Sequence, residues 1–498
     1  MEIYLYLAII IFSVVLRLLP HLIAPQGIGV DHWFWKTYIE TYRKTGQFPP
    51  VLSQFLLDQH QWYPPLFPLL MAKIPEAIFE RYSHILATFI DLIRLALLML
   101  AAYWFTGRIN STIAAGLVYS LTPILISYNV QLNPRGLGAL FLDIIILLLV
   151  WLIWHEGMIW GWALIIIVSG LLLLTHKMTT QLFWFSSILS SIVFVDWRLF
   201  MLVPASIISA IILSKGFYIK VLIAHWDIVS FWNKNWKWIS AHQILESPIY
   251  GKPEFETPTK YFRSGWNGFK HHIKFILGFN PWGWAIFIAS ILHYGQNPFN
   301  PITDEDLWMI QWLGFILLFI VLTTFVPFMR CLGNGYLYNY NAAFPVSLLV
   351  AMIWGGLKHS TLINSILAAT LLACLMGIAV YFWKLKHSKT AKIDDDMDQA
   401  IKHLQKLPEG VVMCFPNHWH DLVAYKTQKK VLSGAHGFGF KLLEPIWPRL
   451  LKPISEIIVE YKVKFVLSYE GYLPEHFINE LPVDSLASFG DYRLYCLK

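Results

Sequence analysis

An acidic residue, Asp31, follows a hydrophobic N-terminal run and opens an aromatic-rich segment, GVDHWFWKTYIETYRKTGQFPP at 29–50. A carboxylate a few residues beyond a membrane span lies where a polar acceptor from water can meet a lipid-borne donor. This position makes Asp31 a candidate functional residue. The alternative is that Asp31 caps the helix that follows, because Asp is a favoured N-cap residue. Phe34 occupies the position of the Glu or Gln that would complete a capping box, and the two roles are compatible.

Two further acids are candidates for a second polar group at this site. Asp58 lies in the same loop, where a solvated loop surface is the simpler explanation. Asp143 follows Asn133-Pro134-Arg135 near the outer end of a predicted span. Within the spans, Asp91 and Arg94 are three residues apart, and we expect them to neutralise each other because intramembrane charges are usually paired.

Basic and aromatic residues near the span ends are candidates for binding an anionic headgroup. Arginine suits this role because its guanidinium group matches phosphate bidentately and keeps its charge. Arg330, for example, precedes a Gly-Asn-Gly turn and several tyrosines that could line a groove. The alternative for any one of these cations is snorkelling to ordinary lipid. The candidate donor-binding residues are His32, Tyr63, Arg135, His176, Lys177, Arg263, Arg330, Tyr336 and Tyr340.

The C-terminal region carries another polar group in PNHWHDLVAYKT, which is followed by LSGAHGFGF. His418, His420 and Asp421 are residue types that bind zinc, but their alternation leaves only two on one face of a strand or loop. No further Cys or His pair follows at a metal-binding spacing, so no metal site is predicted. The glycines of the second stretch let the backbone approach a ligand closely without forming a phosphate loop.

The composition of the chain is that of a membrane protein. Of 498 residues, 56% are hydrophobic and only 14% are charged, whereas about 25% are charged in soluble domains. No long basic block accompanies the net charge of +7, so an anionic lipid or phosphate fits better than nucleic acid. Runs of spanning length recur about eleven times, at 3–23, 82–105, 110–128, 137–154, 158–175, 178–195, 199–215, 273–294, 307–328, 339–357 and 361–383.

An odd number of spans places the C-terminal region on the same side as the loops 24–81 and 216–272. Both loops mix aromatic residues with lysine at helical spacing, which is typical of amphipathic helices in the membrane interface. We therefore predict a polytopic all-α membrane module at 1–390, which includes both loops, and a small α/β domain at 391–498. The predicted strands of this domain are 411–415, 429–434, 463–469 and 492–497, with a Cys414–Cys496 bridge as an open alternative.

Several of these features together resemble the GT-C superfamily of polytopic membrane glycosyltransferases. They are the first span, Asp31, an amphipathic segment that ends at Gly46, and Tyr63-Pro64-Pro65-Leu66 before a long hydrophobic array. The stretches 120–142 and 173–185 also resemble helix connections of these enzymes. The superfamily includes protein mannosyltransferases, aminoarabinose transferases and oligosaccharyltransferases. The resemblance covers about the first 200 residues well and the remainder loosely.

The resemblance implies a sugar donor on a polyprenyl phosphate or diphosphate and an acceptor that is a glycan, a lipid or a protein. In an inverting displacement, Asp31 would accept the proton of the acceptor hydroxyl while the lipid phosphate leaves. Arg330 and Lys177 would stabilise the charge on that phosphate. The first loop reads Asp31-His32 rather than two acids, so a divalent metal is possible but not favoured, and no cofactor is certain.

The same resemblance implies an integral protein of the plasma or inner membrane, with residues 391–498 as an extracytoplasmic domain. The alternative function is that of a polytopic transporter or a lipid or glycolipid flippase without transferase chemistry. A long first loop and a soluble C-terminal domain on one side favour the transferase, because transporters more often have short loops and helices broken near the membrane midplane.

Overall fold

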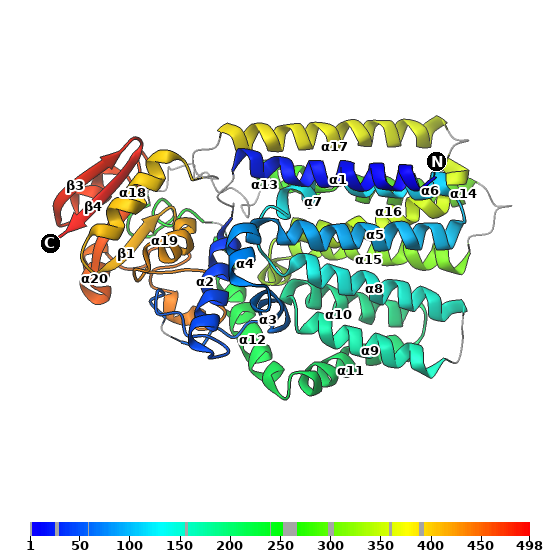
Figure 1. Cartoon of the computed structure of the whole chain (residues 1–498), viewed down its shortest axis with the longest axis horizontal. Helices are drawn as coiled ribbons and strands as arrows, with labels where there is room; N and C mark the ends of the chain where they lie inside the picture. The colour runs from blue at the N-terminus through cyan, green and yellow to red at the C-terminus, as the bar shows by residue number, and fades with distance from the viewer. Residues whose placement is uncertain are drawn as a thin grey trace. The chain divides into compact units, whose positions relative to one another are not determined.

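The structure is a computed structural model that describes residues 2–24, 29–57, 59–154, 158–239, 241–251, 266–296, 303–357, 361–387 and 393–498. The chain forms two compact units, each assembled from three separate segments of the sequence (Figure 1). Unit 1 comprises Met1–Pro25, Ile85–Ile219 and His272–His387. Unit 2 comprises Gln26–His84, Lys220–His271 and Ser388–Lys498.

Unit 1 is a bundle of apolar helices that lie side by side (Figure 1). Its helices are α1 (Glu2–Ile23), α5 (Leu86–Thr106), α6 (Ile109–Ser120), α7 (Pro123–Tyr128), α8 (Arg135–Trp154), α9 (Ile159–Leu173), α10 (Lys177–Val193), α11 (Trp197–Leu213), α14 (Pro281–Gln296), α15 (Asp304–Phe325), α16 (Asn339–Leu357) and α17 (Thr361–His387). Two 3-10 turns, η3 (Pro327–Leu332) and η4 (Gly335–Tyr338), join α15 to α16. Helix α13 (Trp266–Phe279) begins in unit 2 and ends in unit 1. A polytopic helical fold is therefore confirmed.

Helices occupy all the predicted spanning ranges, but not all of them are single straight helices. Among the described residues, five helices are long and apolar enough to cross a membrane alone, and they are Tyr4–Ile23, Glu76–Thr106, Arg135–Leu152, Asp304–Phe325 and Thr361–His387. The predicted span 110–128 is divided into α6 and α7, where Pro123 begins the second helix. The count of eleven crossings stays a prediction.

The predicted span 273–294 is divided between two helices. Helices α13 and α14 meet there at an angle of 81°. The cause is local, because Pro281 has no N–H for the helix ladder and Asn280 supplies the bonds instead. The Asn280 Oδ1 atom accepts the N–H of Gly283 at 3.2 Å, and its Nδ2 atom donates to the carbonyl of Asn339 at 3.2 Å. A bent helix pair of this kind cannot be read from hydrophobicity alone.

A row of four fully buried charges joins helices α1, α5 and α8. Arg17 donates to Asp91, and Arg94 donates to Asp143 at 2.7 Å. Asp91 and Arg94 also lie 3.9 Å apart, as their spacing predicted, although each has a closer partner on another helix. Because the signs alternate, the row is neutral overall, which is how charges are tolerated inside an apolar bundle.

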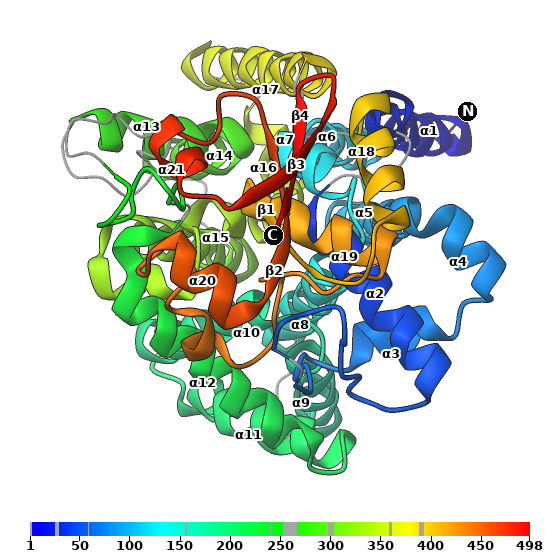
Figure 2. The same cartoon turned by 90° about the vertical axis from the view of Figure 1, so that its left-hand side faces the viewer.

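Unit 2 contains a four-stranded sheet that is packed with helices. Its helices are α2 (Val30–Thr45), α3 (Leu66–Ala72), α4 (Glu76–Tyr82), α12 (Phe217–Asn235), α18 (Asp395–Lys406), α19 (His420–Thr427), α20 (Ile454–Tyr461) and α21 (Glu475–Asn479). The strands are β1 (Val411–Phe415), β2 (Val463–Tyr469), β3 (Val483–Phe489) and β4 (Tyr492–Leu497), in the order β1-β2-β4-β3. Strands β1 and β2 are parallel and the other neighbours are antiparallel. Figure 2 shows α18 and α19 on one side of the sheet and α20 on the other.

The α/β character of the C-terminal region is confirmed, with two corrections in detail. The predicted strand 429–434 is wrong, because it contributes only isolated bridges at Val431. Strand β3 was missed because it is an edge strand whose side chains are mostly exposed, so its sequence lacks a buried apolar run. A Cys414–Cys496 bridge is also wrong. Both thiols are free, and β2 lies between their strands, which separates them by about 10 Å.

All three segments of unit 2 contribute to one hydrophobic core. Leu57 from the first segment and Ile244 and Tyr250 from the second pack among buried residues of the C-terminal segment. The Ser247 hydroxyl donates to the carbonyl of Leu450 at 2.6 Å, and Val431 bridges to Phe55. Segments that share a core cannot lie on opposite faces of a bilayer. The three segments of unit 2 therefore lie on the same side of the membrane.

Candidate functional site

Asp31 lies in the first turn of α2, one residue after the helix begins. The N-cap is Gly29, whose φ of 89° only a glycine adopts easily, and no side chain caps the helix. The alternative that Asp31 is the N-cap is therefore wrong. A carboxylate in the first turn still interacts favourably with the helix dipole. Asp31 is half-buried and His32 beside it is buried, with its ring 4.8 Å from that of Trp33.

Helix α19 packs against α2, and both helices carry an acid in their first turn. Tyr425 near the end of α19 donates to Glu40 at 2.8 Å and its ring lies 5.3 Å from that of Trp33. The Lys36 ammonium group lies 4.6 Å from the centre of the same ring. Asp421 occupies the first turn of α19, and the charge of Asp31 reaches it.

Asp421 is only 1% exposed. Its Oδ1 atom accepts the N–H of Ala435 at 3.1 Å, and it forms no ion pair with any residue that the structure describes. Burial raises the pKa of Asp421 to about 7, with a smaller contribution from the neighbouring charge of Asp31. At neutral pH this second carboxyl group is therefore partly protonated.

Tyr63 ties the first loop to the glycine-rich loop at 433–439. Its hydroxyl group donates to the carbonyl of His436 at 2.9 Å, and the Gln61 Oε1 atom accepts the N–H of Gly437 at 2.6 Å. Burial, with the charges of Asp31 and Asp421, holds the pKa of Tyr63 well above its ordinary value. The phenol thus stays neutral and lies within the field of both carboxyl groups.

The same loop is held from its other side by helix α12. The Asp227 Oδ2 atom accepts the N–H groups of Gly439 at 3.0 Å and Phe440 at 3.1 Å. Gly434 packs so closely that an added Cβ atom would lie 2.3 Å from the Phe55 ring. The glycines of this loop therefore serve close packing against the first loop of the chain.

Arg135 is the cation of unit 1 that is best suited to bind an anion. It begins α8 and is 7% exposed, and its guanidinium group lies 5.0 Å from the centre of the Tyr128 ring. It forms no ion pair within the described residues, and its Nε atom has no hydrogen-bond partner there. The Tyr128 and Tyr336 hydroxyl groups are 3.4 Å apart. A buried cation without an acid partner is suited to bind an anion.

The other predicted donor-binding residues of unit 1 have structural contacts as well. Tyr340 donates to the Asn129 Oδ1 atom at 2.7 Å, and the Arg330 Nε atom donates to the carbonyl of Thr324 at 2.9 Å. His176 is the N-cap of α10, and Lys177 begins that helix. Asp143, a predicted second acid, is fully buried and paired with Arg94. The predicted residues Asp58 and Arg263 lie outside the described residues.

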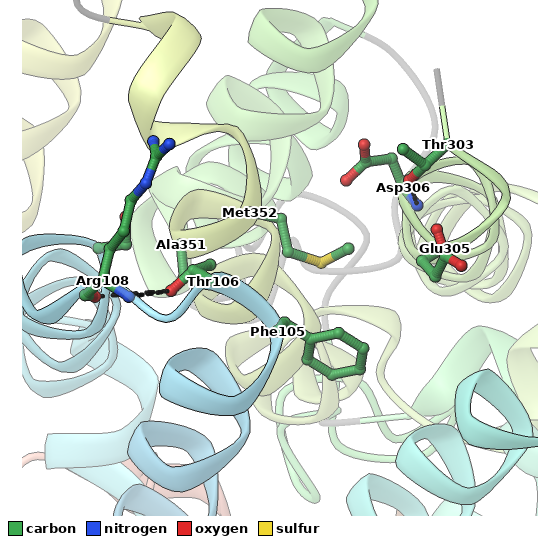
Figure 3. Close-up of a pocket in the computed structure, with 9 residues that line it drawn as sticks. Phe105, Thr106, Arg108, Thr303, Glu305, Asp306, Ala351 and Met352 are labelled. Atoms are coloured by element: carbon green, nitrogen blue, oxygen red, sulfur yellow. Dashed lines mark hydrogen bonds between the residues drawn. The ribbon is translucent and has the colours of Figure 1, made fainter. Parts of the chain in front are cut away.

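Unit 1 also contains a pocket of about 390 Å³ at one end of its bundle. Arg108 lies on one side of the pocket and the acids Glu305 and Asp306 lie on the opposite side, with Met352 and Phe105 between them (Figure 3). None of the predicted site residues lines it. Within the part of the chain that the structure describes, no group of three or more His, Cys, Asp or Glu residues could hold a metal ion.

The structure thus brings together Asp31, His32 and Tyr63 in unit 2, and Arg135, Tyr336 and Tyr340 in unit 1. Sequence reasoning assigned no acid-base role to Asp421, which it considered only as a zinc ligand. The signal that could have raised its rank was a lone acid in an otherwise apolar and aromatic helix start, HWHDLVAY.

No protein-family model matches the sequence, and a comparison with curated proteins found no match either. Solved structures do resemble it. ArnT from Cupriavidus metallidurans bound to undecaprenyl phosphate superposes with a TM-score of 0.60 at 11% identity, over 98% of this chain and 97% of that one. The apo state of the same protein gives a TM-score of 0.57 at 10% identity.

The oligosaccharyltransferase of Archaeoglobus fulgidus, tethered to an acceptor peptide that contains the NVT sequon, is also similar. Its TM-score is 0.55 at 12% identity, over 94% of this chain and 69% of that one. Both neighbours are membrane glycosyltransferases of the GT-C superfamily. At these identities the likeness establishes the fold. The chain is an integral membrane protein with the GT-C fold.

Proposed function

We propose that this protein is a glycosyltransferase that moves a sugar from a polyprenyl-phosphate or polyprenyl-diphosphate carrier to an acceptor. The observation that carries the proposal is Arg135, a buried guanidinium group without an acid partner among the described residues. The fold supports it, because a neighbour with the same fold over nearly its whole length binds undecaprenyl phosphate. The acceptor is a glycan, a lipid or a protein.

In the proposed reaction, Asp31 acts as the general base. It accepts the proton of the acceptor hydroxyl group as that oxygen forms a bond to the anomeric carbon. The bond from this carbon to the phosphate oxygen breaks at the same time, so the configuration inverts and the lipid phosphate leaves with the electron pair. A positioned base contributes roughly 10²–10⁴-fold to such a step.

Cations stabilise the charge that grows on the leaving phosphate. We assign this role to the cations Arg135, Arg330 and Lys177. All three lie in unit 1 near the ends of apolar helices. Tyr336 and Tyr340 contribute phenol groups to the donor headgroup. His32 orients the acceptor beside Asp31.

We further propose that unit 2, and with it the C-terminal segment 391–498, is extracytoplasmic in a plasma or inner membrane. A lipid-linked sugar delivered to that side and an acceptor in the cell envelope suit this orientation. The common core of the three segments supports the part of this proposal that places them together on one side.

The test is an Asp31→Asn variant in proteoliposomes that contain a radiolabelled polyprenyl-phosphate sugar. We expect the release of polyprenyl phosphate to fall by about 100-fold or more, because the base is lost while the shape is kept. Donor binding, measured by quenching of tryptophan fluorescence, should change little. An Arg135→Gln variant should instead raise KM for the donor.

The matched control is Glu40→Gln, which removes a carboxylate farther along the same helix. It should leave turnover unchanged. Transfer of labelled lipid across the bilayer without release of polyprenyl phosphate, unaffected by Asp31→Asn, would contradict the proposal and favour a flippase.

A further inference from the structure

We propose that Asp421 is a positioning residue of the Asp31 site and that its own protonation tunes the basicity of Asp31. This inference rests on the proposed function and adds a pH response to it. It begins with geometry, because α2 and α19 pack against each other, each carries a carboxyl group in its first turn, and the Ala435 N–H group that binds Asp421 lies in the loop that Tyr63 also binds.

The two carboxyl groups differ in their surroundings. Asp31 is half-buried, whereas Asp421 is 1% exposed. Two like charges close together in an apolar environment are costly, so one proton is retained, and the more buried carboxyl group holds it. Asp421 is therefore the protonated member near neutral pH, and Asp31 is the carboxylate that meets the acceptor.

The titratable groups that reach Asp421 do not supply a compensating positive charge. They are Asp31 from α2, Tyr63 from the first loop and Cys414 from β1. Burial raises the pKa of the Cys414 thiol, so it stays neutral. Burial lowers the pKa of the adjacent His420 to about 4, so it is neutral as well.

The charged residues of α2 and α19 gather around Tyr425 and Trp33, where the Lys426 ammonium group lies 5.5 Å from the centre of the Trp33 ring. Lys36 and Glu40 on α2 contact Tyr425, at the far end of α19. Helix α18 meets α19 at that same end, where Gln405 donates to the carbonyl of Lys426. The ionisation of Asp421 is therefore governed by burial, the Ala435 N–H group and the charge of Asp31.

The direction of the effect follows from these charges. Below about pH 7 Asp421 is neutral and does not affect Asp31 electrostatically. Above that pH, a negative Asp421 raises the proton affinity of Asp31 and makes it a stronger base. The wild-type protein thus gains base strength with rising pH, and an Asp421→Asn variant does not.

The first experiment does not depend on activity. Infrared difference spectra of the full chain in nanodiscs, recorded across pH, follow the C=O stretch of protonated carboxyl groups. We expect a band that titrates near pH 7 in the wild type and is absent in Asp421→Asn. In Asp31→Asn the band should remain, with its midpoint lowered by about one pH unit. Glu40→Gln, on the same helix as Asp31, should not move it.

The second experiment measures turnover in proteoliposomes at two pH values. Asp421→Asn should match the wild type at pH 6, where Asp421 is neutral in both, and should be roughly 3- to 10-fold slower at pH 8. An equal loss at both pH values would show a merely structural role and overturn the inference. So would a band midpoint that Asp31→Asn leaves unchanged.

The two experiments separate this inference from the proposed function. If the protein has no transferase activity but Asp31→Asn lowers the midpoint of the Asp421 band, the proposed function fails and the carboxyl pair stands. If Asp31→Asn abolishes turnover but the band does not move, the proposed function stands and the coupling is overturned.

Discussion

At the scale of single residues, the imidazole ring of His436 is the clearest case of a polar group placed at a cost. It is 1% exposed, its ring lies 5.1 Å from that of Phe55, and neither of its nitrogens has a hydrogen-bond partner within the described residues. Burial lowers the pKa of His436 to about 3. The folded protein therefore keeps this ring neutral over the whole physiological range.

A His436→Leu variant tests this reading. Below pH 6.5 this ring is protonated in the unfolded chain but stays neutral in the folded chain. The wild type therefore loses stability as pH falls from 6.5 toward 3. At pH 5 the loss is about 2 kcal/mol. We expect the apparent melting temperature of the variant to fall less between pH 7 and pH 5 than that of the wild type. An equal fall in both proteins would contradict it.

The candidate residues were partly predictable from the sequence. Asp31 and Arg135 were among the sequence candidates because charged residues next to apolar runs are rare, although helix capping by the acid and snorkelling by the cation were the alternatives. The coupling of Asp421 to Asp31 was not predictable, since nearly the whole chain separates them and only the packing of α19 on α2 brings them near. Local sequence does not encode contacts between such distant segments.

At the scale of elements, the loop at 433–439 packs closely against the first loop of the chain. It accepts a hydrogen bond from Tyr63 and donates hydrogen bonds to Gln61 and Asp227. The sequence predicted that its glycines let the backbone approach a ligand. In the structure, the close neighbours of Gly434 and Gly437 are the aromatic rings of Phe55 and Tyr63.

A Gly434→Ala variant should therefore destabilise the protein. The added Cβ atom would lie 2.3 Å and 2.6 Å from two atoms of the Phe55 ring, which cannot move aside because Phe55 is fully buried. We expect a loss of about 1–3 kcal/mol, seen as a lower apparent melting temperature. Gly278→Ala is the control, because nothing lies within 4 Å of its added Cβ atom. Similar stability of both variants would contradict this prediction, because it would show that the loop can shift away from the Phe55 ring.

At the scale of the whole molecule, the hydrophobic runs predicted where the helices lie. A long apolar segment is stable as a helix in a bilayer whichever helices it packs against. They did not predict the bend between α13 and α14, which depends on Pro281 and the side-chain bonds of Asn280. The row of charges through α1, α5 and α8 was predicted only as a pair, since the sequence shows spacing within one helix and not between helices.

An Asp91→Asn variant tests whether this row holds unit 1 together. It leaves Arg17 buried without its acid, which typically costs 3–5 kcal/mol. We expect a large drop in the apparent melting temperature in detergent and less folded protein in membranes. Asp196→Asn is the control, because its ion pair with Arg198 is exposed and such pairs contribute less than about 1 kcal/mol. Equal effects of the two variants would show that the buried row has no special role.

The interleaved composition of unit 2 has a consequence for biosynthesis. Its first segment leaves the ribosome early, but the strands it packs against are translated last, after all the apolar helices. Until translation ends, Phe55 and Leu57 lack their native neighbours and can form non-native contacts. Chaperone binding to the nascent first loop, and a sharp sensitivity of yield to C-terminal truncation, should accompany the production of this protein in a cell.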